Sequence, residues 1–131
     1  MLNFLRTITT LSGLGLAAMG LLWWVQPAIA ADILRASLLE GTGLSTQIGD
    51  SGAFFVGSGS LLAWGALSNR ATLVLLGGVL VGLVIPGRVL SATVHGGAWT
   101  PNEIVAECVI VILALATASA IQRHRQSSLF R

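Results

Sequence analysis

Residues 71–94 read ATLVLLGGVLVGLVIPGRVLSATV, a stretch whose only charged residue is Arg88. A run of about 20 mainly apolar residues is long enough to cross the hydrocarbon core of a bilayer. Because no water is present there, the backbone polar groups must pair within the segment, which favours a helix. The sequence therefore predicts a transmembrane helix over residues 71–94.

Three further apolar runs meet the same requirement, and they cover residues 7–25, 49–67 and 104–121. The chain is 54% hydrophobic and only 9% charged, whereas soluble domains carry roughly 25% charged residues. We therefore expect an all-α fold, a four-transmembrane-helix bundle formed by residues 1–131 as a single domain.

The charges of the chain separate onto the two ends of the predicted helices. One end carries basic residues without any acid: Arg6, Arg70, Arg123, Arg125 and Arg131. The other end carries all the acids: Asp32, Glu40, Asp50, Glu103 and Glu107. Because basic flanks stay on the cytoplasmic side, we expect both termini in the cytoplasm. Trp23, Trp24 and Trp99 would mark the opposite interface.

The connections also carry structural signals. Residues 28–40 are rich in helix formers and Gly41 and Gly43 follow, which predicts a short interfacial helix that stops before the second span. The turn at residues 68–70 is so short that the second and third helices must be antiparallel neighbours. Thr100-Pro101-Asn102-Glu103 has the pattern of a capping box at the start of the fourth helix.

The first span has a competing interpretation as a signal peptide. Arg6 precedes the apolar stretch, and Ala28-Ile29-Ala30 resembles a small-residue cleavage site. Trp23 and Trp24, followed by Gln26-Pro27, instead suggest the interfacial end of a retained helix. We favour retention.

Small residues recur four apart within the spans, a spacing that lets helices approach closely in lipid. The pairs are Gly13 and Ala17, Ala53 and Gly57, Gly59 and Ala63, Gly78 and Gly82, and Ala114 and Ala118. With sixteen glycines in the chain, such pairs arise easily. We interpret them as internal packing surfaces rather than as a dimerisation face.

Ionisable residues inside spans are costly, which draws attention to Asp50, Arg88, Glu103 and Glu107. Arg88 lies about 9 Å from the end of its helix near residue 94, and Glu107 about 10 Å from residue 100. Because these depths match, we predict an ion pair between Arg88 and Glu107, with Asp50 or Glu103 as a second acceptor.

Two interpretations of this cluster remain open. In the first, the ion pair is structural and aligns the third and fourth helices. In the second, the four residues line a small outward-facing pocket, with Arg88 as an anion-binding fork and the carboxylates as proton or cation partners.

Several functional classes lack support in the sequence. The Arg residues are scattered between apolar segments, so no nucleic-acid-binding stripe forms. His95 stands alone in a turn and Cys108 lies in an apolar run, so neither indicates a metal site. No nucleotide-binding loop or catalytic triad is present, and we expect no enzyme. No cofactor is identified.

Taken in order, the motifs resemble those of the DoxX-like small four-helix membrane proteins, and most closely a domain family of that type without an assigned activity. The resembling segments are Gln26-Pro27, residues 49–55, Gly87-Arg88, His95-Gly96-Gly97, and Glu103 with Glu107. The resemblance implies a bacterial inner (plasma) membrane location. Relatives include subunits of quinone-linked oxidation systems and membrane chaperones.

Short spans, little mass outside the membrane and the lack of a catalytic set lead to a first functional hypothesis. The chain would be a non-enzymatic accessory or scaffold subunit that packs against a larger membrane protein complex and contacts membrane lipids. The alternative is a small-molecule or quinone-binding module whose polar site, formed by Asp50, Arg88, Glu103 and Glu107, lies at the outer end of the bundle.

Overall fold

The computed structural model describes residues 1–129, and within them every regular element is a helix. The elements are α1 (Leu2–Val25), α2 (Pro27–Ile33), α3 (Gly41–Leu67), α4 (Ala71–Gly82), α5 (Val84–Val94) and α6 (Pro101–Leu129). The predicted all-α class is confirmed. Arg131, which was assigned to the basic end, lies outside the described residues.

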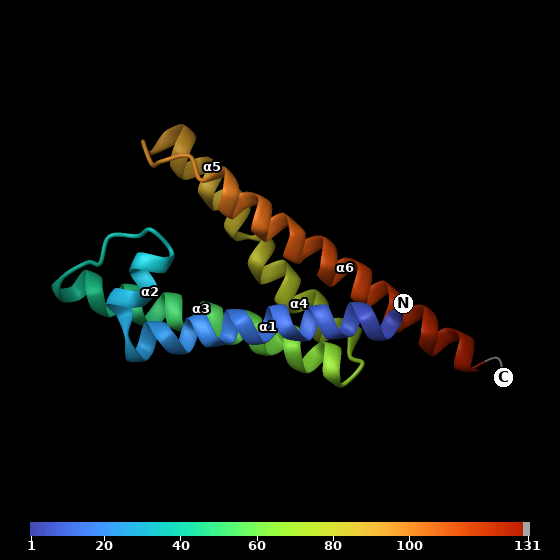
Figure 1. Cartoon of the computed structure of the whole chain (residues 1–131). Helices are drawn as coiled ribbons and strands as arrows, with labels where there is room; N and C mark the ends of the chain where they lie inside the picture. The colour runs from blue at the N-terminus through green and yellow to red at the C-terminus, as the bar shows by residue number, and fades with distance from the viewer. Residues whose placement is uncertain (130–131) are drawn as a thin grey trace.

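The helices form two arms that diverge from a common base (Figure 1). In the first arm α1 lies along α3, and in the second arm α4 and α5 lie along α6. The arms meet near the N-terminus, at what we call the Arg6 end, which holds the start of α1, the α3–α4 turn and the last part of α6. They separate toward the Arg88 end, which holds α2, α5 and the start of α6.

Close backbone contact holds the first arm together. A Cβ atom added to Gly13 would lie 2.6 Å from the backbone nitrogen of Ala63 and from the carbonyl oxygen of Gly59. Gly59 is equally confined by the backbones of Gly13 and Ala17. Only residues without bulky side chains permit this approach, which replaces hydrophobic association in lipid. The predicted internal role of these small residues is confirmed.

Close packing at small residues also holds the second arm together. A Cβ atom on Gly78 would lie 2.7 Å from the Cβ of Ala114, so the pair Gly78 and Gly82 faces α6 rather than a second chain. Gly57 differs, because an added Cβ there would meet nothing within 4 Å. The predicted packing role of Ala53 and Gly57 therefore has no counterpart within this chain.

The larger of two buried apolar clusters lies at the base of the two arms. A buried cluster there draws on α3, α4 and α6, and its members are Leu62, Ala66, Val74, Ala114, Ala118 and Ile121. Between the arms, the hydroxyls of Thr9 and Thr117 are 2.7 Å apart and fully buried. A buried interhelical hydrogen bond of this kind fixes the relative position of two helices in lipid.

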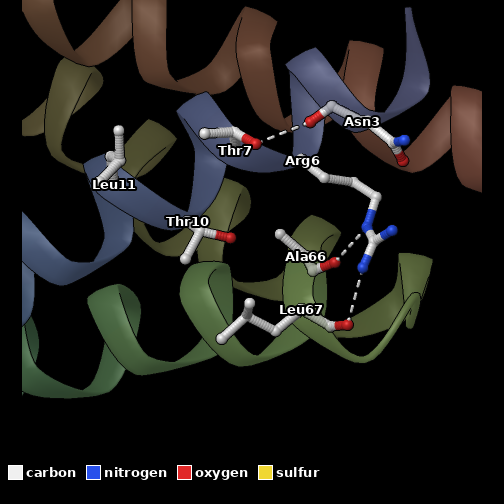
Figure 2. Close-up of a pocket in the computed structure, with 7 residues that line it drawn as sticks. All are labelled: Asn3, Arg6, Thr7, Thr10, Leu11, Ala66 and Leu67. Atoms are coloured by element: carbon white, nitrogen blue, oxygen red, sulfur yellow. Dashed lines mark hydrogen bonds between the residues drawn. The ribbon is translucent and has the colours of Figure 1, made fainter.

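Arg6 closes the end of α3, as Figure 2 shows. Its Nε donates to the carbonyl of Ala66 at 2.8 Å and its Nη2 to the carbonyl of Leu67 at 2.9 Å. These carbonyls have no partner within the helix, and a cation at a helix C-terminus also interacts favourably with the helix dipole. Asn69, with φ of 54°, then reverses the chain into α4. The predicted adjacency of the second and third helices is confirmed.

The first long connection contains the expected short helix, but the predicted stop signal is wrong. Gly41 begins α3 instead of ending a helix, so α3 starts eight residues before the predicted span at residue 49. The side chain of Gln47 explains the extension: it accepts from Leu39 N–H and donates to the Ser37 carbonyl, at 3.0 and 3.1 Å. The loop is thus tied onto the first turns of α3.

The predicted span over residues 71–94 is present but divided between α4 and α5. The break falls at Leu83, just before Pro86. Pro86 has no N–H to donate to the carbonyl four residues earlier, and its ring crowds that carbonyl, so the regular helix ends there. Helix α5 contributes no buried residue, in keeping with its place where the arms diverge.

By length and composition, three segments within residues 1–129 could cross a membrane: Leu2–Val25, Ala71–Val94 and Pro101–Ser128. They correspond to the first, third and fourth predicted spans, with α1 and α6 longer than expected. Helix α3 has 27 residues and is not among these segments. Its first turns are polar, and they include Thr42, Thr46 and Asp50.

Candidate functional site

The four residues singled out in the sequence come together around one cavity. Asp50 on α3, Arg88 on α5, and Glu103 and Glu107 on α6 all line a cavity of about 540 Å³ between the two arms at the Arg88 end. Pockets that bind small organic molecules have volumes of roughly 300–1,000 Å³. The cavity is therefore large enough to hold such a molecule.

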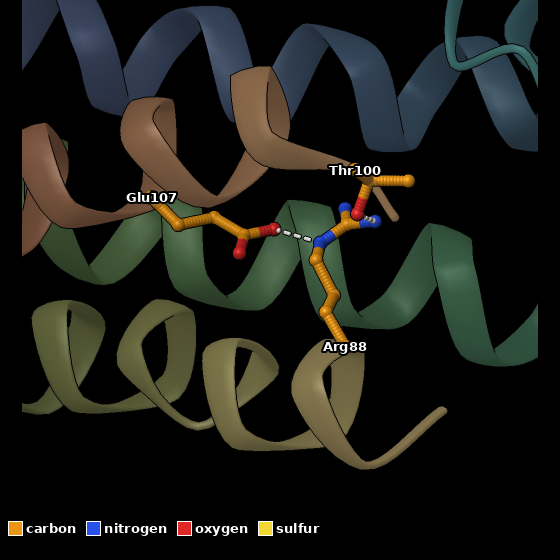
Figure 3. A network of polar contacts seen from close by, with 3 residues as sticks. All are labelled: Arg88, Thr100 and Glu107. Carbon is orange, nitrogen blue, oxygen red and sulfur yellow. Dashed lines mark hydrogen bonds and ion pairs between the residues drawn. The ribbon is translucent and has the colours of Figure 1, made fainter. Parts of the chain in front are cut away.

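Inside the cavity, Arg88 and Glu107 form the predicted ion pair (Figure 3). Arg88 Nε lies 2.7 Å from Glu107 Oε1, and the two side chains are 32% and 13% exposed. This geometry is that of a charge-assisted hydrogen bond. Both residues lie on the second arm, so the pair holds α5 to α6 and leaves the gap between the arms open.

The predicted second acceptor is wrong. Arg88 Nη1 donates to Thr100 Oγ1 at 3.4 Å, and no ion pair joins Arg88 to Asp50 or Glu103 in the part of the chain described. Asp50 belongs to the other arm, which has already diverged at this level. Thr100 belongs to the same arm as Arg88 and stands at the start of α6, within reach of its guanidinium.

Because Arg88 donates to the hydroxyl of Thr100, the predicted capping box forms only in part. Helix α6 does begin at Pro101, and the carbonyl of Thr100 accepts the first helical hydrogen bond, from Ile104 N–H at 3.1 Å. The hydroxyl of Thr100, however, is engaged by Arg88, and among residues 1–129 no hydrogen bond joins it to Glu103. Glu103 is left to face the cavity.

Two buried polar atoms around the cavity have no hydrogen-bond partner. They are Glu107 Oε2 and Trp23 Nε1, and they are the only such side-chain atoms in the described part of the chain. Buried polar groups are nearly always paired, because leaving one unpaired costs about 1–3 kcal/mol. Both atoms belong to residues that line the cavity, and each would gain a partner if its side chain turned toward a molecule bound there.

Trp23 was expected at the membrane interface, and that assignment is wrong. Its side chain is only 1% exposed and packs with Ala30 and Ala31 of α2. Helix α2 folds back over the end of α1, so the indole is enclosed between protein segments rather than placed among lipid headgroups. Trp24 and Trp99 remain largely exposed, in keeping with an interfacial role.

Aromatic and aliphatic side chains complete the cavity wall. Phe54 and Phe55 stand edge to face, with ring centroids 5.3 Å apart, and both line the cavity with Trp23. The deeper aliphatic lining comes from Leu16, Val81, Val84 and Ile110. Sequence reasoning missed the aromatic wall, although Phe54 follows Asp50 by four residues and so shares its helical face.

The polar and apolar parts of the lining occupy different depths. Leu16 and Ile110 lie nine residues from the nearer ends of α1 and α6, or about 14 Å along each helix. Asp50, Arg88 and Glu103 lie nearer the Arg88 end, and Asp50 is exposed at the cavity mouth. The cavity therefore has an apolar floor and a charged mouth, which suits an amphipathic molecule.

Comparisons with known proteins add no assignment: no protein family, curated protein or solved structure matches this chain. The resemblance to DoxX-like proteins therefore stays a prediction from the motifs. In the described part of the chain, no group of three or more His, Cys, Asp and Glu side chains is placed to hold a metal ion.

Proposed function

We infer that this chain is a membrane protein that binds a small amphipathic molecule in the cavity at the Arg88 end. The observation that supports this most strongly is a cavity of about 540 Å³ whose lining residues include two with unpartnered buried polar atoms. A purely structural ion pair would account for Arg88 and Glu107. It would not account for an unpaired Trp23 indole beside an empty volume.

The proposal includes α3 as a fourth span, alongside the three helices that are apolar enough on composition alone. At about 1.5 Å per residue, its 27 residues extend roughly 40 Å, longer than the roughly 30 Å hydrocarbon core. The polar turns from Gly41 to Asp50 would then stand at the interface. Trp64, exposed near the other end of α3, would mark the opposite interface.

The orientation follows from the charges. Arg6, Arg70, Arg123 and Arg125 belong to the Arg6 end, and all five acids belong to the Arg88 end or to segments joined to it. We place the Arg6 end, with both termini, in the cytoplasm. The cavity then opens on the outer side. A bacterial inner membrane remains the expected location, on the resemblance to DoxX-like proteins.

Single cysteines at the two ends of α3 test this topology. In a Cys108→Ala background, intact cells would be treated with a membrane-impermeant maleimide. Ser37→Cys, in the loop before α3, should label, and Ser68→Cys, in the turn after it, should label only after the membrane is opened. Equal labelling of both positions in intact cells would show that α3 does not span, and the reverse pattern would invert the orientation.

Native mass spectrometry of the full chain, released from its own membrane in a mild detergent, tests the binding function. We expect a small-molecule adduct on the wild-type chain. Ala106→Trp fills the cavity and should remove the adduct, because Ala106 belongs to its lining. Val105→Trp is the matched control, because Val105 is 62% exposed and does not line the cavity. An adduct that persists in Ala106→Trp would contradict the assignment.

The accessory-subunit hypothesis remains a second proposal with a distinct expectation. It requires a stoichiometric protein partner, which would remain bound during affinity purification from native membranes. The exposed apolar surfaces of the arms do not favour it specifically, because membrane lipid covers such surfaces equally well. We therefore rank it below the cavity.

A further inference from the structure

We propose that the molecule bound in the cavity is an organic cation: an amine or ammonium head carried on an apolar body. This inference rests on the proposed binding function and gives the chemical class of the ligand. The charge of the cavity lining, the contacts of Arg88 and the aromatic wall all favour such a ligand.

The lining carries an excess of negative charge. Three carboxylates, those of Asp50, Glu103 and Glu107, face a single guanidinium, that of Arg88. Within residues 1–129 the structure records no ion pair for Asp50 or Glu103. A cleft lined by one sign of charge concentrates ligands of the opposite sign, so this cavity favours a cation over a neutral molecule and disfavours an anion.

Arg88 is poorly placed to reverse that preference. Its Nε is committed to Glu107 and its Nη1 to Thr100. A guanidinium recognises an anion best by presenting two parallel N–H groups. Two of the five N–H groups of Arg88 already have acceptors, and one of them is the Nε–H, so the fork formed by Nε and Nη2 is not free for an anion. Arg88 instead positions Glu107, leaving Oε2 of that carboxylate unpaired.

The unpaired oxygen of Glu107 and the aromatic wall fit such a ligand in detail. Glu107 Oε2 is an acceptor without a donor, which an ammonium N–H would supply. Trp23 and the edge-to-face pair of Phe54 and Phe55 line the same volume, and aromatic faces attract cations.

Three probes that share one apolar chain test the charge preference: octylammonium, octan-1-ol and octanoate. The full chain would be reconstituted in phosphatidylcholine nanodiscs, and binding of each probe measured by equilibrium dialysis, with empty nanodiscs subtracted. We expect octylammonium to bind most tightly and octanoate most weakly. Cavity binding is checked separately, since Ala106→Trp should reduce binding of octylammonium and octan-1-ol, whereas Val105→Trp should not.

Two double variants test which carboxylates cause the preference for a cation. Asp50→Asn with Glu103→Gln should weaken octylammonium binding on the order of tenfold, because two partly screened charge contacts are lost, and leave octan-1-ol within about twofold. Asp32→Asn with Glu40→Gln removes the same charge from residues outside the cavity lining. That control should change octylammonium binding by less than about twofold.

The outcomes separate the two proposals. If octan-1-ol and octylammonium bind equally to the wild-type chain and both respond to Ala106→Trp, the cavity stands and the cation preference is overturned. If octanoate binds most tightly, the cation preference is overturned in favour of an anion site. If no probe binds above empty nanodiscs and no native adduct is found, both proposals are overturned.

Discussion

An arginine joins two helices of one arm at each end of the molecule, but within residues 1–129 only the Arg6 end also has side-chain hydrogen bonds between the arms. At the Arg6 end, the guanidinium is spent on the carbonyls of Ala66 and Leu67, and the arms are joined by buried Thr9 and Thr117. At the Arg88 end, the guanidinium pairs with Glu107 inside one arm. In the described part of the chain, no side-chain hydrogen bond or ion pair bridges the arms at that end.

The residues that join the arms and the residues that line the proposed binding cavity therefore lie at opposite ends of the molecule. At the Arg6 end the buried hydroxyls of Thr9 and Thr117 are paired across the arms, so this end fixes how the arms are joined. The Arg88 end leaves a volume unfilled and two buried polar atoms unpaired, which a packed bundle avoids. Substitutions at the two ends should therefore separate into those that change unfolding and those that change ligand binding.

The largest effect on stability is expected from Gly59→Ala, in the tightly packed first arm. The new Cβ would meet the backbone of Gly13 and Ala17, so α1 and α3 must move apart. We expect the free energy of unfolding to fall by about 2–3 kcal/mol, the range typical of overpacking. Unfolding by sodium dodecyl sulfate, followed by circular dichroism in a mild detergent, measures the change.

Gly57→Ala is the matched control on the same helix, two residues away. Nothing lies within 4 Å of the added Cβ, and alanine is a better helix former than glycine. Its stability should rise by as much as about 1 kcal/mol. Equal losses in both variants would mean that close packing does not hold the first arm together.

The next largest effect is expected where the arms are joined. Thr117 Oγ1 donates to the Leu5 carbonyl at 3.5 Å, which leaves the hydroxyl of Thr9 as the donor to Thr117. Thr117→Val removes that acceptor and leaves Thr9 with a buried, unpaired hydroxyl, at a loss of about 1–2 kcal/mol. Thr9→Val should cost about 0.6 kcal/mol, because Thr117 keeps its other partner.

The same denaturation assay distinguishes the two threonine variants. The double substitution of both threonines by valine should cost less than the sum of the single substitutions, since neither hydroxyl is then left alone. A loss from Thr9→Val that exceeds the loss from Thr117→Val would show that the direction of the hydrogen bond is reversed.

The fold was largely predictable because its determinants are local. Apolar runs locate the spans at residues 71–94 and 104–121, and the tight turn at residues 68–70 makes two helices neighbours. The start of α3 was not predictable from composition, because Gln47 stabilises the extra turns by reaching back to a loop. The break before Pro86 is local, and the missing N–H of proline signals it.

The site was predictable only within one arm. Equal depth along adjacent helices was enough to pair Arg88 with Glu107, since depth follows from the helical rise. Whether Asp50 also reached Arg88 depended on the separation of the two arms, which the sequence pattern does not encode. The burial of Trp23 likewise depends on α2 folding over α1. The sequence pattern alone therefore does not distinguish a tryptophan at the membrane interface from one that lines a cavity.

A small effect on stability, and the sharpest test of the contrast between the ends, is expected from Arg88→Gln. The pair lies inside one arm and is partly buried, with Arg88 32% and Glu107 13% exposed, so its loss should lower the unfolding free energy by about 1 kcal/mol. Because the substitution frees Glu107 and makes the cavity more negative, octylammonium should bind several-fold more tightly. Equilibrium dialysis in nanodiscs measures this change.

Arg35→Gln is the control for Arg88→Gln, because it removes the same charge from the Arg88 end at a residue outside the cavity lining. It should leave octylammonium binding within about twofold, since Arg35 is exposed to solvent and its charge is screened. An anion-binding Arg88 predicts the opposite result: octanoate binding would be lost on substitution and octylammonium binding would not improve. Loss of octylammonium binding in folded Arg88→Gln protein would instead mean that Glu107 contacts the ammonium head only while Arg88 holds it in position.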